Sequence, residues 1–84
     1  MLEKINEKVS ANLVYDAQKG AVYPSQILWQ GKTFAITKIG YHHLTREGRN
    51  TKHIFSVSDS SLFFKLALDT ENLNWTLEEV SDGT

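Results

Sequence analysis

Hydrophobic and polar residues alternate over most of the chain from Ser25 onward, and short turn sequences interrupt the alternation. This part is rich in β-branched and aromatic residues, and its apolar spacing nowhere fits an amphipathic helix. Gln30 and Gly31 lie between two apolar runs and suit a two-residue primed turn, which would place Ile27 opposite Phe34. The pattern predicts an antiparallel β-meander.

Two further two-residue turns, at Asp59-Ser60 and Thr70-Glu71, are compatible with a single register that keeps all apolar positions on one face. The predicted opposite pairs are Val57 with Leu62, Phe55 with Phe64, Leu68 with Leu73, Leu66 with Trp75, Phe64 with Leu77, Ile39 with Val57, Tyr41 with Phe55 and His43 with His53. A slip of one residue would turn all of these side chains to solvent, so the pattern strongly specifies the face.

The strand that follows Gly31 must change face. Phe34 and Ile36 have one parity, whereas Ile39 and Tyr41 have the other, which predicts a β-bulge or bend near Lys38. Such bends let a short meander curl over itself, so we expect an all-β fold: a small antiparallel meander of about six strands, forming a curled sheet or a half-open SH3-like or OB-like barrel. The expected core residues are Trp29, Phe34, Tyr41, Phe55, Phe64, Trp75 and Leu77.

The two ends of the chain have weaker patterns. Residues 1–8 are charged and are predicted to be flexible, with a first strand from Val9 to Tyr15 and a turn from Asp16 to Gly20. We therefore expect a single β domain over residues 9–80 and a disordered tail over residues 81–84.

Composition narrows the classes of function. The 84 residues are 40% hydrophobic and 23% charged, which is typical of one small globular domain. The absence of cysteine excludes disulfides, thiolate metal sites and a cysteine nucleophile. The formal net charge of -1 gives no general reason to expect nucleic acid or an anionic membrane as partner. No apolar run has the length of a signal peptide, so we expect a cytoplasmic protein.

Catalytic and cofactor motifs are missing from the sequence. The serines next to Asp59 belong to a turn and lack the glycine context of a nucleophile elbow, and the glycines are too far apart for a phosphate-binding loop. His43 and His53 would form half of a metal site, but a closed zinc site needs about four ligands. We interpret them as a cross-strand polar pair and expect neither an enzyme, nor a cofactor, nor a resident metal.

The segment from Leu44 to Lys52 is longer than a hairpin connection needs, and such loops often carry binding residues. Its basic side chains and its aromatic neighbours could hold phosphates while a ring stacks on a base. The candidate residues are Tyr41, His43, Arg46, Arg49, Lys52 and His53. This loop supports an alternative hypothesis, weak binding of single-stranded nucleic acid.

Three apolar residues, Phe63, Ala67 and Val80, interrupt the otherwise polar outer face of the predicted sheet. Apolar groups that gather on a small surface often mark contacts with other proteins. The leading hypothesis is therefore a non-enzymatic module that self-associates or binds a protein partner, through this face with Phe63 or through an exposed strand edge.

The order of these features resembles that of small bacterial β-domains grouped as the DUF6504 type. The likeness covers a first strand, a link through Gly20 and Pro24, an apolar hairpin and a closing aromatic strand. The matching core and turn positions are Trp29, Gly31, Phe34 and Trp75. The resemblance implies a shared β fold and no catalytic residue. Gln30 stands where the family often has arginine, and this chain is less basic, which weakens any expectation of nucleic-acid binding.

Overall fold

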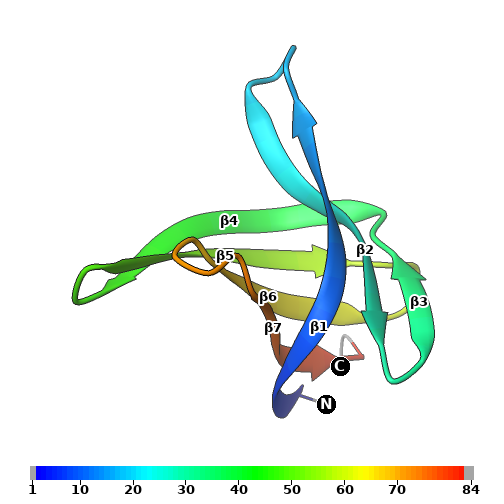
Figure 1. Ribbon diagram of the computed structural model, residues 1–84. Coiled ribbons are helices and arrows are strands. Elements are labelled where there is room, and N and C mark those ends of the chain that lie inside the picture. Colours follow the sequence, from blue (N-terminus) through cyan, green and yellow to red (C-terminus); the bar gives the residue numbers. More distant parts are fainter. Residues whose placement is uncertain (1, 83–84) are drawn as a thin grey trace.

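A computed structural model describes residues 2–82, which form one antiparallel sheet (Figure 1). The strands are β1 (Leu2–Asp16), β2 (Ala21–Trp29), β3 (Lys32–Ala35), β4 (Lys38–Glu47), β5 (Asn50–Ser58), β6 (Phe63–Asp69) and β7 (Trp75–Ser81). Their order across the sheet is β3-β2-β1-β7-β6-β5-β4, so β3 and β4 are its two edges. The predicted all-β antiparallel fold is confirmed, but the sheet has seven strands and does not close into a barrel. The described residues contain no helix that could cross a lipid bilayer.

Strand β1 begins at Leu2 and not, as predicted, at Val9. Its first half pairs with β7, for example Leu2 with Ser81 and Glu3 with Val80, so the charged N-terminal residues lie in the sheet. Ser81 is the last residue of β7, and the expected tail therefore starts within a strand; residues 83–84 of that tail lie outside the described residues. The sequence pattern missed this pairing because the first half of β1 is mostly exposed and lacks apolar alternation.

The first predicted hairpin is confirmed. Ile27 lies opposite Phe34, and Gln30 and Gly31 join the strands with φ angles of 52° and 74°. Positive φ at both central residues is the geometry of a type I′ turn, whose twist matches that of the flanking strands.

The other two turns are longer than predicted, and each shifts the register by two residues. Val57 lies opposite Phe64 instead of Leu62, because Asp59 Oδ1 accepts hydrogen bonds from the backbone amides of Ser61 and Leu62 at 2.7 and 2.6 Å. This turn therefore spans residues 59–62.

The same change occurs between β6 and β7. Leu68 lies opposite Trp75, whereas Leu73 is in the turn, 71% exposed and with a φ of 61°. The amide of Leu73 donates to the carbonyl of Asp69 at 2.7 Å, which tightens the wider turn. A shift of two residues keeps the same side chains on the same face, so the core survives both errors.

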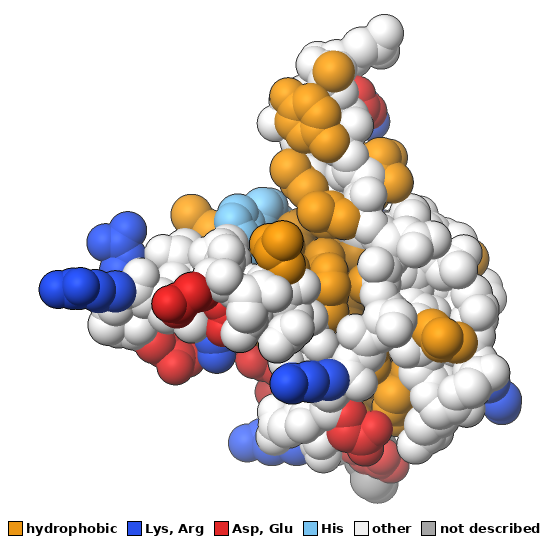
Figure 2. Space-filling model, viewed as in Figure 1, with side chains coloured by type: hydrophobic (Ala, Val, Ile, Leu, Met, Phe, Trp, Pro, Cys, Tyr) orange, Lys and Arg blue, Asp and Glu red, His pale blue; other side chains and the backbone are white. Residues whose placement is uncertain are grey.

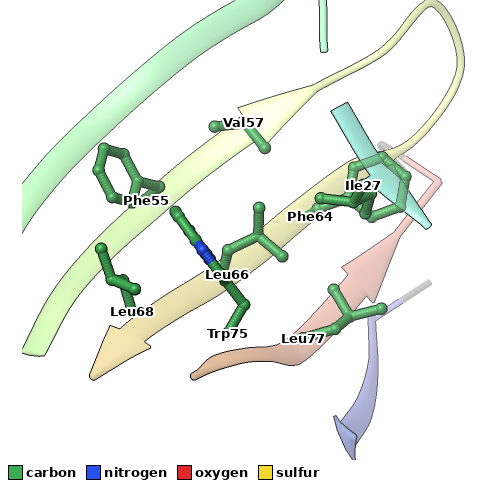
Figure 3. Close-up of a cluster of buried hydrophobic side chains, with 8 residues drawn as sticks. All are labelled: Ile27, Phe55, Val57, Phe64, Leu66, Leu68, Trp75 and Leu77. Atoms are coloured by element: carbon green, nitrogen blue, oxygen red, sulfur yellow. The ribbon is translucent and has the colours of Figure 1, made fainter. Parts of the chain in front are cut away.

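The core lies on the concave face of β5, β6 and β7 (Figure 3). The β2–β3 hairpin covers one end of it: Ile27 is fully buried, and the rings of Phe34 and Phe64 lie 5.3 Å apart. The buried cluster consists of Ile27, Phe55, Val57, Phe64, Leu66, Leu68, Trp75 and Leu77. Of the expected core residues, Trp29 and Phe34 pack against this cluster while partly buried, whereas Tyr41 does not belong to it and is exposed.

The exclusion of Tyr41 has a local cause. The irregularity predicted near Lys38 is confirmed: residues 36–37 join β3 to β4, and a bulge follows between Ile39 and Tyr41. Ile39 lies opposite Val57 as expected, but the extra residue Gly40 places Tyr41 opposite Ser56. A Cβ on Gly40 would lie 3.2 Å from the carbonyl oxygen of Ser56, so the strands approach closely here.

Candidate strand-docking surface

The ends of β1 and β2 project from the body of the molecule as a two-stranded arm (Figure 1). We call residues 13–24 the β1–β2 arm, because β1 pairs with β7 only as far as Val9 and β2 pairs with β3 only from Gln26 onward. At its tip Asp16 Oδ1 accepts hydrogen bonds from the amides of Gln18 and Lys19. An isolated two-stranded ribbon is at best marginally stable in water, so the arm gains from any further contact.

The arm carries exposed apolar side chains. Leu13 is 46% exposed and Tyr15 is 66% exposed. A register shift separates both from Ala11, which packs against the core, and Tyr23, which also packs against the core, lies opposite Val14 between them. Figure 2 shows hydrophobic atoms along the arm that continue to the centre of the molecule, where histidine atoms lie beside them.

Strand β4 forms the long edge of the sheet. Within residues 2–82 it pairs with β5 alone, and from Tyr41 to Glu47 this pairing is regular. We call residues 41–47 the β4 edge. Tyr41 is 61% exposed and Leu44 is 58% exposed, one on each face. The opposite edge, β3, has only 4 residues, so β4 offers the longer row of backbone groups to a partner.

The bulge at Gly40 changes which histidines meet. His42 lies opposite Phe55 and reaches across to His53, with 2.8 Å between His42 Nε2 and His53 Nδ1. The predicted pair of His43 with His53 is therefore wrong: His43 lies opposite Ile54 on the other face, beside the ring of Tyr41 at 5.0 Å.

The His42 ring continues the aromatic core toward the concave surface. It stacks on Phe55 with centroids 4.2 Å apart and planes within 9°, and Phe55 in turn contacts Trp75 at 5.7 Å. Burial, together with the neighbouring rings of His53 and His43, lowers the pKa of His42 below its ordinary value of 6.5. His42 is therefore mostly neutral near pH 7. No group of three or more His, Asp or Glu side chains among the described residues could hold a metal ion.

The predicted basic loop is a continuation of the two strands. β4 extends to Glu47 and β5 begins at Asn50, so only a tight turn through Gly48 and Arg49 connects them. Lys/Arg atoms gather at the end of this hairpin in Figure 2. Arg46 lies opposite Thr51, whereas Lys52 lies opposite Thr45 and forms an ion pair with Glu47 at 3.6 Å. Because neighbouring residues alternate in face, Arg46 and Lys52 do not point to the same side.

The predicted outer apolar face is also divided. Phe63 is exposed, but Ala67 is buried, and Val80 lies opposite Phe64 and packs against the core. Phe63 borders a shallow pocket of about 310 Å³. The Lys65 ammonium at this pocket lies 4.0 Å from Glu78 and 3.9 Å from Glu79. Only Phe63 of the three residues therefore offers apolar contact area on this side.

Sequence reasoning did not find the surface between the arm and the β4 edge. Leu13, Tyr15 and Leu44 are the exposed apolar residues that it missed. The apolar run Leu13-Val14-Tyr15 was visible in the sequence, but such a run is equally typical of a buried strand. The free edge of β4 depends on strand order, which the sequence does not reveal.

Comparison with known proteins adds no family assignment: no family model, no curated protein and no solved structure matches the chain. The resemblance to the DUF6504 type therefore stays a prediction.

Proposed function

We propose that this protein is a non-enzymatic protein-interaction module that binds an extended polypeptide segment along the β4 edge. The observation that supports this most is the regular, exposed stretch from Tyr41 to Glu47, on a strand that has a single neighbour within residues 2–82. Such an edge offers a row of backbone donors and acceptors to a further strand, and binding by strand addition uses exactly these groups.

The side chains of this stretch differ from those of a protected edge. Natural sheets guard edges with short strands, lysines, prolines or bulges. On β4, Lys38 and the bulge after Ile39 lie at its beginning, and the charged residues Arg46 and Glu47 lie at its end. Between them Tyr41 and Leu44 present apolar area on the two faces, so an added strand would gain side-chain contacts as well as hydrogen bonds.

The β1–β2 arm supplies a second surface. In Figure 1 it rises on the same side as the free edge of β4. Leu44 belongs to the face that carries the core, since it lies opposite His53, which lies opposite the core residue Leu68. The exposed side chains of Leu13 and Tyr15 on the arm offer further apolar area to a segment that extends from β4.

Selection from a displayed library of random peptides tests this proposal. We expect wild-type protein to select peptides with alternating apolar residues, and we expect a selected peptide to lose its affinity for the double variant Tyr41→Lys, Leu44→Lys. The matched control is Leu28→Lys, because Leu28 is 45% exposed on β2 and remote from the β4 edge. Peptides that bind the double variant as well as they bind wild type would refute the proposal.

A further inference from the structure

We infer that the segment bound by the β4 edge is the β4 edge of a second copy of this chain, paired antiparallel about Leu44. This inference rests on the proposed strand-docking function and names its partner. The two sheets would then form one continuous sheet across a two-fold axis, a common arrangement for homodimers.

Symmetry limits the possible registers. Neighbouring antiparallel strands of one sheet are related by a two-fold axis perpendicular to the sheet, so directly opposite residues lie on the same face. Because faces alternate along a strand, a residue must lie directly opposite the same residue of the second copy. The axis lies midway between these two residues, and we name it by that residue. The regular stretch runs from Tyr41 to Glu47, and an axis through its middle residue, Leu44, uses the whole stretch.

The charges favour this register over one centred on His42. Pairing about Leu44 places Arg46 opposite His42 of the second copy and Glu47 opposite Tyr41, whose phenol is a suitable donor to a carboxylate. An axis through His42 would instead place Arg46 opposite Lys38, which is a repulsive pair.

An axis through His43 also fits less well. It would place Arg46 opposite Gly40, where the bulge interrupts regular pairing. With the axis at Leu44, the bulge lies outside the paired stretch.

The histidine beside Arg46 is compatible with this pairing near neutral pH. His42 is already hydrogen-bonded to His53 and stacked on Phe55, and both contacts leave it on the concave face that Arg46 shares. A neutral imidazole next to a guanidinium avoids the repulsion that an imidazolium would cause. Within one chain the groups that act on the charge of His42 are His53 and His43, and the pairing would add Arg46 of the second copy.

Leu44 itself gives the sharpest consequence. Its side chain would meet the same side chain of the second copy at the axis, which removes apolar area from water on both chains. Opposite Cα atoms of an antiparallel pair lie about 4.5–5.5 Å apart, within the range that a disulfide bridges.

Single-cysteine cross-linking tests this register, because the chain contains no cysteine. We expect Leu44→Cys to form a disulfide-linked dimer under mild oxidation roughly tenfold or more faster than Leu28→Cys, since pairing raises the effective thiol concentration. His42→Cys should cross-link faster with Arg46→Cys than with itself. Equal rates for Leu44→Cys and Leu28→Cys would overturn the inference.

Charge exchange at the axis gives an independent readout that needs no oxidation. Leu44→Lys and Leu44→Glu should each weaken dimerisation in sedimentation equilibrium by about thirtyfold, because each loses the apolar contact and places like charges together. An equimolar mixture should restore much of the affinity. The inference is overturned if wild-type protein stays monomeric up to about 1 mM. In that case, loss of selected peptides on Tyr41→Lys, Leu44→Lys would still support the proposed function, whereas unchanged peptide binding would refute both.

Discussion

Leu73 distinguishes the observed register from the one that the sequence pattern predicts, and Leu66, which is in the core in both, is the matched reference. With a two-residue turn at Thr70-Glu71, Leu73 would lie opposite Leu68 in the core; in the structure it lies in the turn and is 71% exposed. Leu66 is fully buried and belongs to the core cluster. Replacing each leucine with alanine removes the same atoms, so any difference reports their surroundings.

We expect Leu66→Ala to lower the free energy of unfolding by about 3–5 kcal/mol, the upper part of the range for buried leucines, because its surroundings are packed on all sides. Leu73→Ala should change it by no more than about 0.5 kcal/mol, as is usual for surface positions. A stability of about 4–13 kcal/mol is ordinary for a chain of this length. The first variant therefore loses a large fraction of the total.

Urea unfolding followed by tryptophan fluorescence measures both variants, since Trp75 belongs to the core and changes environment on unfolding. Unchanged m-values would show that the shift in midpoint reflects stability alone. A loss of about 2 kcal/mol or more for Leu73→Ala would show that Leu73 is buried and that the wider turn is wrong.

The remaining predictions concern a turn, a histidine and the alternative function. Asp59→Ala should cost about 1 kcal/mol in urea unfolding, while Asp59→Asn, which keeps an acceptor for the amide of Leu62, should cost less. The lowered pKa of His42 means that the unfolded chain binds more protons below about pH 6.5, so stability should fall as the pH drops from there through the folded pKa; His42→Gln should flatten this part of the pH profile, and an unchanged profile would contradict the cause. We expect no anisotropy change with a labelled single-stranded oligonucleotide at about 20 mM salt, where electrostatic contacts are favoured; salt-sensitive binding that is lost in the double variant Arg46→Ala, Arg49→Ala would support the nucleic-acid alternative.

The inward faces of β5, β6 and β7 were predictable from the sequence, but the exact register was not. Apolar alternation at positions such as Phe55, Phe64 and Trp75 determines which side chains are inside, and all three are buried. The two wider turns depend on side-chain caps by Asp59 and on backbone bonds at Asp69, and alternation has no information about either. Because both errors were of two residues, the core side chains of β5, β6 and β7 stayed on the predicted face while their pairing was shifted; Leu73 left the core for the turn.

The surface was less predictable than the core. The bulge at Gly40 reverses the faces of the residues that follow, which moves Tyr41 outward and brings His42 to His53. We predicted that Arg46 and Lys52 belong to a connecting loop, yet both lie in paired strands and on different faces. An exposed edge is a property of strand order, which arises from long-range pairing such as that between β1 and β7.

Hydrogen exchange along β4 tests the central claim, that this edge is free in the isolated chain and is where a further strand binds. In dilute protein, amides from Tyr41 to Glu47 should alternate between slow exchange, where they face β5, and fast exchange, where they face outward, because successive amides of a strand point in opposite directions. In concentrated protein, or with a selected peptide, the fast set should become slow while amides of β3 keep their rates. Fast exchange of the outward amides at every concentration and with every such peptide would contradict the account.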